Sequence, residues 1–184
     1  VLGRDGQMRR LSNDGEGTWA TADLARWDGF TPGTAGPGDF RLLAQDLDNN
    51  GALDLIASGP GGAFIWMGAG PGKFQPLPAT ISERVFAAAD LSGSGRLDLL
   101  ALSADRRPDR LRNAGARDYH WRDVRPYANS AEIIHKGDNR VNSFGVGGEA
   151  EVRSGLLVQK QQMVGPCLHF GLGDHDKITV LRLV

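Results

Sequence analysis

Oxygen-bearing side chains recur at alternate positions in a short acidic loop near residue 50. Gly51 follows the third of them, where the chain must turn sharply. Alternate side chains of a tight loop point inward together, and several hard, mostly anionic oxygens in a loose geometry are the donor set that Ca²⁺ prefers. We therefore expect a calcium site, with the backbone carbonyl of Ala52 as a further ligand. The side-chain ligands expected are Asp46, Asp48, Asn50 and Asp54.

A second acidic loop with the same spacing begins 44 residues further along the chain. Ser92 and Ser94 stand at its middle positions, and a ligand set with fewer charges should bind calcium more weakly. Side chains of such loops also bond their own backbone in Asx turns. The number of ligands favours a metal site in the first loop. In the second loop, a metal site and an Asx turn both stay open. The ligands expected in the second loop are Asp90, Ser92, Ser94, Asp98 and the backbone carbonyl of Arg96.

The segments that flank these loops are typical of short β-strands. Apolar runs over residues 53–58, 63–67 and 97–102 are bounded by Gly or Pro, and the chain has 26 Gly and nine Pro. An EF-hand needs a glutamate at loop position twelve, where the first loop has Ala57. A unit of several strands that repeats about every 44 residues is typical of a β-propeller blade. The fold class predicted is all-β, with partial propeller-type blades.

A different pattern follows after about residue 119. Strand-like runs cover residues 149–154, 156–164, 167–170 and 177–184. Ala150 and Val152 alternate with Glu149, Glu151 and Arg153, so one face of that strand should be buried and the other solvated. We predict incomplete propeller-type repeats over residues 1–127 and a small antiparallel β-domain over residues 128–184.

Two other groups of residues offer an alternative function, a hydrolase or carbohydrate-binding domain. One is the cluster from His169 to Asp176, and the other is the aromatic and basic patch from Tyr119 to Tyr127. In an alternating strand, His169 should point away from its apolar neighbours and towards solvent. A zinc site needs three or four converging ligands, so a structural role is favoured for the first group. For the second, a binding role and a packing role stay open.

Composition excludes several classes of protein. The net charge of −1 gives no general attraction to nucleic acid. No run reaches the roughly 18 consecutive apolar residues of a membrane-spanning helix. The single cysteine, Cys167, excludes an intramolecular disulfide framework. The sequence begins with Val and shows no signal peptide, so localisation is not read from a targeting segment.

The two acidic loops resemble the FG-GAP or VCBS repeats of integrin-α-like β-propellers, in which Asp-x-Asp-x-Asn-Gly-x-x-Asp-Leu loops bind calcium. The C-terminal part resembles the ASPIC/UnbV domain, which follows such repeats in the cartilage acidic protein family and in bacterial relatives. The residues that carry the second resemblance are Asn142-x-x-Gly145-Val146-Gly147-x-x-Ala150-x-Val152, Leu168-His169-Phe170-Gly171-Leu172-Gly173 and Ile178-x-Val180.

The resemblance implies a secreted or periplasmic protein with a role in adhesion or assembly, without a defined catalytic activity. Its cofactor would be Ca²⁺, and its partner a protein or a glycan. A complete propeller of this family needs about seven blades, and the family's Trp-Pro-x-Gly ending does not follow Val184. We therefore expect part of a longer protein, in which unpaired blade edges make an intermolecular β contact or an oligomer.

Overall fold

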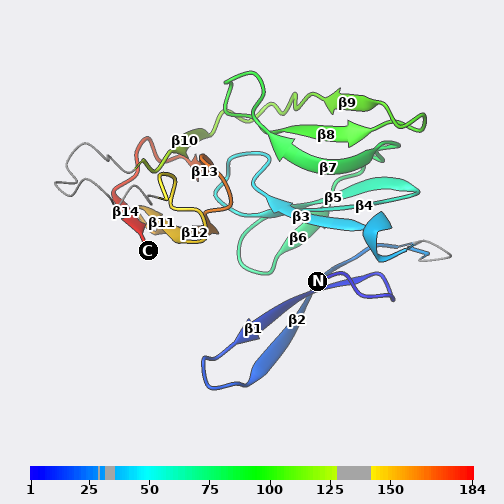
Figure 1. Ribbon diagram of the computed structural model, residues 1–184, viewed down its shortest axis with the longest axis horizontal. Helices are drawn as coiled ribbons and strands as arrows, with labels where there is room; N and C mark the ends of the chain where they lie inside the picture. Colours follow the sequence, from blue (N-terminus) through cyan, green and yellow to red (C-terminus); the bar gives the residue numbers. More distant parts are fainter. Residues whose placement is uncertain (29, 32–35, 128–141) are drawn as a thin grey trace, which may run out of the picture. The chain divides into compact units, whose positions relative to one another are not determined.

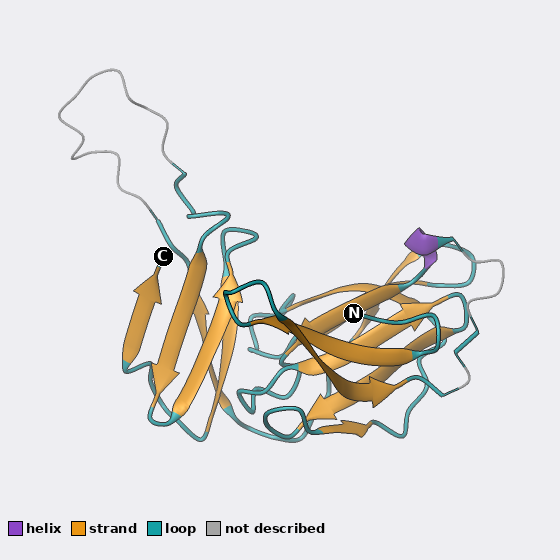
Figure 2. Ribbon diagram, turned by 90° about the horizontal axis from the view of Figure 1, so that it is seen from below, coloured by secondary structure: helices purple, strands orange, loops and turns teal. Residues whose placement is uncertain are grey.

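A computed structural model describes residues 1–28, 30–31, 36–127 and 142–184 (Figure 1). Within these residues the fold is all-β, as predicted, and consists of small open antiparallel sheets without a closed propeller (Figure 2). A 3₁₀ turn, η1, spans Pro37–Asp39. The described part contains no helix of the length and apolarity needed to cross a membrane.

The contacts divide the chain into two compact units. The first unit comprises residues 1–47 and 52–115, and the second comprises residues 48–51 and 116–184. The predicted domain boundary between residues 127 and 128 borders the segment 128–141, which lies outside the described residues. Residues 116–127 group with the second unit because their strand pairs there.

Three antiparallel sheets make up the first unit, and each follows the order of the chain. The predicted strands at 53–58, 63–67 and 97–102 are observed within one residue of those bounds, as β4, β5 and β8. The sheets are β1 (Gln7–Asn13) with β2 (Trp19–Arg26); β3 (Arg41–Gln45), β4 (Asp54–Gly59), β5 (Gly62–Gly68) and β6 (Phe74–Pro76); and β7 (Arg84–Ala89), β8 (Asp98–Leu102) and β9 (Pro108–Leu111).

The register of the strands reproduces the sequence repeat. Gln45 pairs with Asp54 across the first acidic loop, and Ala89 pairs with Asp98 across the second. The outer hairpin repeats as well. Asn13 pairs with Trp19 at the end of β1–β2, as Gly68 pairs with Phe74 at the end of β5–β6. The chain therefore contains the outer pair of one repeat, a four-stranded repeat and a three-stranded repeat.

Strand β4 is buried on both faces because a sheet packs against each of them. Ile56 lies in one apolar cluster with Val85 and Leu99 from the third sheet. Its neighbour Leu55 lies in a second apolar cluster, together with Trp27, the residue that follows β2. Successive side chains of a strand point to opposite faces, so a strand between two sheets reads as a continuous apolar run. This packing holds the acidic loops at the ends of β4 and β8.

The second unit is built from two sheets. The runs expected at 149–154, 156–164, 167–170 and 177–184 correspond to its strands β11 to β14. Side-chain amides of Gln159 and Gln161 donate to the carbonyls of Gly171 and His169, at 2.6 Å each, and link β12 to β13. The sheets are β10 (His120–Val124) with β13 (Leu168–Gly173), and β12 (Leu157–Gln162), β11 (Glu149–Ser154) and β14 (Val180–Leu183).

The predicted alternation along β11 holds for its apolar residues but not for Glu151. Ala150 and Val152 are fully buried in the core of this unit. Glu151 was expected on the solvated face, yet it is only 7% exposed. Arg153 and Lys160 cover it with ion pairs of 2.7 and 3.3 Å. The hydrogen bond from Arg153 is the main reason that the pKa of Glu151 lies below its usual value.

Phe170→Ala is expected to lower the free energy of unfolding by about 3–5 kcal/mol, because this ring is fully buried in the core of the second unit. Leu156→Ala is the matched control, since that side chain is 100% exposed and its loss should change stability by less than about 0.5 kcal/mol. Urea denaturation of both variants measures the difference. Equal losses would contradict this description of the core.

Candidate metal site

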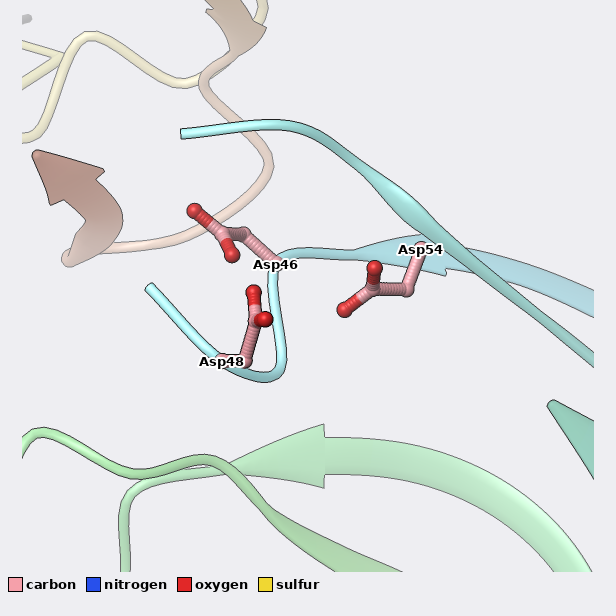
Figure 3. Close-up of side chains that lie close together, drawn as sticks. All are labelled: Asp46, Asp48 and Asp54. Atoms are coloured by element: carbon pink, nitrogen blue, oxygen red, sulfur yellow. The ribbon is translucent and has the colours of Figure 1, made fainter. Parts of the chain in front are cut away.

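Three carboxylates meet in the first acidic loop, between β3 and β4 (Figure 3). Ligand oxygens of Asp46, Asp48 and Asp54 all lie within 4.8 Å of one another, and within the described residues this is the only such group of three carboxylate, His or Cys side chains. Asp46 is 4% exposed and Asp54 is fully buried. The side chain of Asp48 is 19% exposed. The structure thus brings together the three carboxylates that the spacing predicts.

Asp54 fixes the shape of this loop from the first residue of β4. Its Oδ2 accepts a hydrogen bond from the backbone N–H of Leu47 at 2.7 Å, and its Oδ1 accepts one from Gly68 at 2.6 Å. The side chain of Leu47 is buried in the core of the first unit. Because Leu47 stands between Asp46 and Asp48, these contacts determine where both flanking carboxylates lie.

The turn of the loop depends on two residues in the left-handed region. Asn49 has a φ of 62° and Gly51 a φ of 87°. The predicted turn at Gly51 is therefore observed, and Asn49 is a residue type that tolerates this backbone conformation. The backbone N–H of Asn50 donates to Asp48 Oδ1 at 3.2 Å, as in an Asx turn. Metal binding by Asn50 and by the carbonyl of Ala52 stays a prediction.

In the second acidic loop, the carboxylate of Asp90 accepts hydrogen bonds from the backbone of the loop itself. Asp90 Oδ1 accepts hydrogen bonds from the N–H groups of Ser92 and Ser94 at 3.1 Å each, and its Oδ2 accepts one from Gly95 at 2.6 Å. Burial acts to raise the pKa of Asp90, but these donors outweigh it and the pKa is lowered. The Asx-turn arrangement is thus present in this loop. Metal binding by its residues, the carbonyl of Arg96 included, remains a prediction.

Asp98, the counterpart of Asp54 in the second repeat, forms an ion pair with Arg110. Arg110 donates to Asp98 Oδ2 from Nη2 at 2.6 Å and from Nε at 3.0 Å, and the N–H of Asn113 donates to Oδ1 at 2.9 Å. Arg110 pairs with Leu100 in β8–β9 as Ile65 pairs with Ile56 in β4–β5.

An uncharged side chain, Ile65, thus stands in the first repeat where the second has a guanidinium. Sequence analysis missed this partner because the spacing within the acidic loop does not show which residue of β9 lies beside Asp98. The charge alternation Asp109–Arg110 within β9 was the available signal.

His169, in β13, is not the solvent-facing residue that alternation predicts. Its side chain is only 11% exposed, and its ring stacks on Trp121 with centroids 5.5 Å apart. Nδ1 lies 3.1 Å from Asp123 Oδ1, and Nε2 lies 2.8 Å from Oδ1 of Asn49, which belongs to the same unit. The prediction was wrong because β10 pairs with β13 and its Trp121 covers the ring.

Residues of the two alternative groups contact each other. The carboxylate that His169 contacts comes from β10, whereas Asp176 accepts a hydrogen bond through its backbone carbonyl from Arg122 at 2.6 Å. The Tyr119 ring lies 5.7 Å from the guanidinium of Arg117. Tyr127 is 75% exposed and borders a surface pocket of about 450 Å³.

The Asp98 ion pair predicts a specific pH dependence. Burial opposes ionisation of Asp98, but Asn113 and Arg110 outweigh it, so its folded-state pKa lies below the ordinary value of 3.8. Such a carboxylate contributes its full stability above about pH 4 and loses that contribution as the pH falls further. Asp98→Asn should cost about 1–3 kcal/mol at pH 7. Urea denaturation in EDTA should show a smaller difference from the wild type at pH 3, and an equal difference would contradict the ion pair.

Comparison with models of protein families matches residues 46–101 to the FG-GAP-like repeat. The matched segment begins at the first carboxylate of the first loop, includes the second loop and ends in β8. Comparison with curated proteins and with solved structures found no match. The chain therefore contains an FG-GAP-like repeat, and the three clustered carboxylates lie within it.

Proposed function

We propose that this chain is a non-catalytic binding module, stabilised by calcium in its first acidic loop, of a secreted or periplasmic protein that takes part in adhesion or assembly. The FG-GAP-like repeat supports a module that binds rather than catalyses, and such repeats are typical of extracellular proteins. The partner is a protein or a glycan. Ca²⁺ would contribute positive charge and tolerance of irregular oxygen geometry.

The observation that carries the calcium proposal is the group of three carboxylates that the first loop brings together. In the second repeat, Arg110 supplies positive charge to the buried Asp98. In the first repeat Ile65 takes that position, while the loop gathers three carboxylates within 4.8 Å. Arg117 lies 3.7 Å from Asp48, and its own side chain is 64% exposed. Carboxylates this close repel one another by several kcal/mol where water is partly excluded, and a divalent cation offsets that repulsion.

The oxygens present fit calcium better than a transition metal. The cluster consists of carboxylates, with an amide and backbone carbonyls in the same loop, and it contains neither His nor Cys. Hard oxygen donors favour Ca²⁺ or Mg²⁺ over zinc or copper. Mg²⁺ demands near-ideal octahedral geometry, whereas an irregular loop with a left-handed residue between ligands suits the flexible coordination of Ca²⁺. Asp46, Asp48 and Asp54 would hold the ion.

We further propose that residues 128–184 belong to an ASPIC/UnbV-like domain of a cartilage acidic protein-like family. The residues of the resemblance have defined structural tasks, which supports the proposal. Asn142 closes the turn before β11 by donating to the carbonyl of Val146 at 2.7 Å and accepting from its N–H at 3.0 Å. Gly145 and Gly147 have φ values of 63° and 96°, which favour glycine.

A thermal melt tests the calcium proposal. Millimolar Ca²⁺ should raise the Tm of the wild-type chain over that in EDTA, since a ligand at a hundred times its Kd stabilises the folded state by about 2.7 kcal/mol, which is several degrees. Asp48→Ala should abolish the shift. We choose Asp48 because Asp54 also holds backbone groups, so its removal would disturb the loop itself.

Asp118→Ala is the matched control, because it removes an exposed carboxylate outside the loop and should leave the calcium shift intact. Mg²⁺ at the same concentration separates calcium binding from general screening of charge. A wild-type Tm that is the same in calcium and in EDTA would refute the proposal and leave the first loop as a turn of the repeat.

A further inference from the structure

The side chain of Asn113 connects the two acidic loops through backbone carbonyls of Leu47 and Leu97. It follows β9, and its Nδ2 donates to the backbone carbonyl of Leu47 at 2.8 Å and to that of Leu97 at 3.2 Å. Leu47 lies in the first loop, 66 residues away in the chain, and Leu97 lies at the end of the second. Its Oδ1 accepts a hydrogen bond from the N–H of Gly115 at 3.0 Å. One carboxamide therefore uses both of its donors and its acceptor.

The orientation of this carboxamide follows from its partners. In the opposite orientation, Oδ1 would face the carbonyl oxygens of Leu47 and Leu97, and Nδ2 would face the N–H of Gly115. Every one of these contacts would then join two acceptors or two donors. The backbone N–H of Asn113 is bonded to Asp98, so the residue is also anchored in its own repeat.

Leu47 is thus held on three sides. Its N–H bonds Asp54, its carbonyl accepts from Asn113, and its side chain is 8% exposed in the core. With the carbonyl turned towards Asn113, the carboxylates on either side, Asp46 and Asp48, are the groups that face the loop centre together with Asp54. A binding loop that is already ordered loses less entropy when its ligand binds.

We propose that Asn113 is a positioning residue for the first acidic loop, so that the calcium affinity of residues 46–54 depends on a side chain of the following repeat. This inference rests on the calcium site proposed above. Asn113 does not contact the ion. It holds the Leu47 peptide in the orientation that keeps the carboxylates together, and without it the loop must become ordered at the expense of binding.

The chain offers a matched control for this residue. Asn13 occupies the same hairpin position in β1–β2, and its Oδ1 accepts from the N–H of Gly15 at 2.6 Å, in the same turn that Asn113 makes with Gly115. Asn13 is exposed and far from the acidic loops in the strand order. The same position is a glycine, Gly68, in the four-stranded repeat. The fold therefore already accommodates a glycine at this hairpin position in one of its repeats.

Isothermal titration of the full chain with CaCl₂ tests the proposal. Asn113→Gly should weaken calcium binding by about three- to tenfold, the effect of one or two hydrogen bonds, and Asn13→Gly should leave the Kd unchanged. Asn113→Asp keeps the size of the side chain and the acceptor for Gly115 but loses the two donors, so it should weaken binding as well. It serves as the second variant if Asn113→Gly does not fold cooperatively in EDTA.

Amide hydrogen exchange in EDTA gives a readout that needs no metal. The N–H of Leu47 should exchange faster in Asn113→Gly than in the wild type, and at the wild-type rate in Asn13→Gly. A purely structural role would lower the Tm equally in EDTA and in calcium and leave the Kd as it is. Wild-type binding with an unchanged Kd in both Asn113 variants would overturn this inference alone. A wild-type chain that shows neither a binding heat of either sign nor a Tm shift with calcium would overturn the calcium site and this inference together.

Discussion

A buried aspartate at the start of the second strand organises each repeat. Asp54 and Asp98 stand at equivalent positions, and each accepts a backbone N–H from the far end of the following hairpin, at Gly68 and at Asn113. A buried carboxylate is costly unless hydrogen bonds compensate for the lost water. In the first repeat, the bonds of Asp54 to Leu47 and Gly68 tie the acidic loop to the outer turn of the following hairpin. They hold Leu47, the residue between the carboxylates of Asp46 and Asp48.

Adjacent repeats protect only the sides of the loops that face each other. Leu47 and Leu97, whose carbonyls share Asn113, are 8% and 4% exposed. Their repeat counterparts, Leu91 and Leu53, are 51% and 47% exposed. The same residue type at the same repeat position is therefore buried or exposed according to whether a neighbouring loop covers it. Burial here is a property of the stack of repeats and not of a single repeat.

Local patterns predicted the strands and the first loop, and non-local pairing determined what they missed. Turn glycines, short apolar runs and alternate carboxylates are visible within a dozen residues, so β4, β8 and the cluster around Asp48 could be anticipated. The partner of Asp98 depends on which residue of β9 lies beside β8. The burial of His169 depends on its pairing with β10, some 46 residues away. Sequence spacing within one segment holds no record of such registers.

Arg110 gives the buried Asp98 of the second repeat a counter-charge that belongs to the chain itself. A guanidinium on the same chain stays charged at every physiological pH and cannot be diluted or chelated. Asp98 thus keeps its counter-charge wherever the protein is placed. A neighbouring repeat that relies on a dissolved ion would instead respond to the ionic composition of the medium. Two related repeats, one with an arginine and the other with a hydrophobic residue at the same register position, would then form a constant half and a responsive half of the same stack.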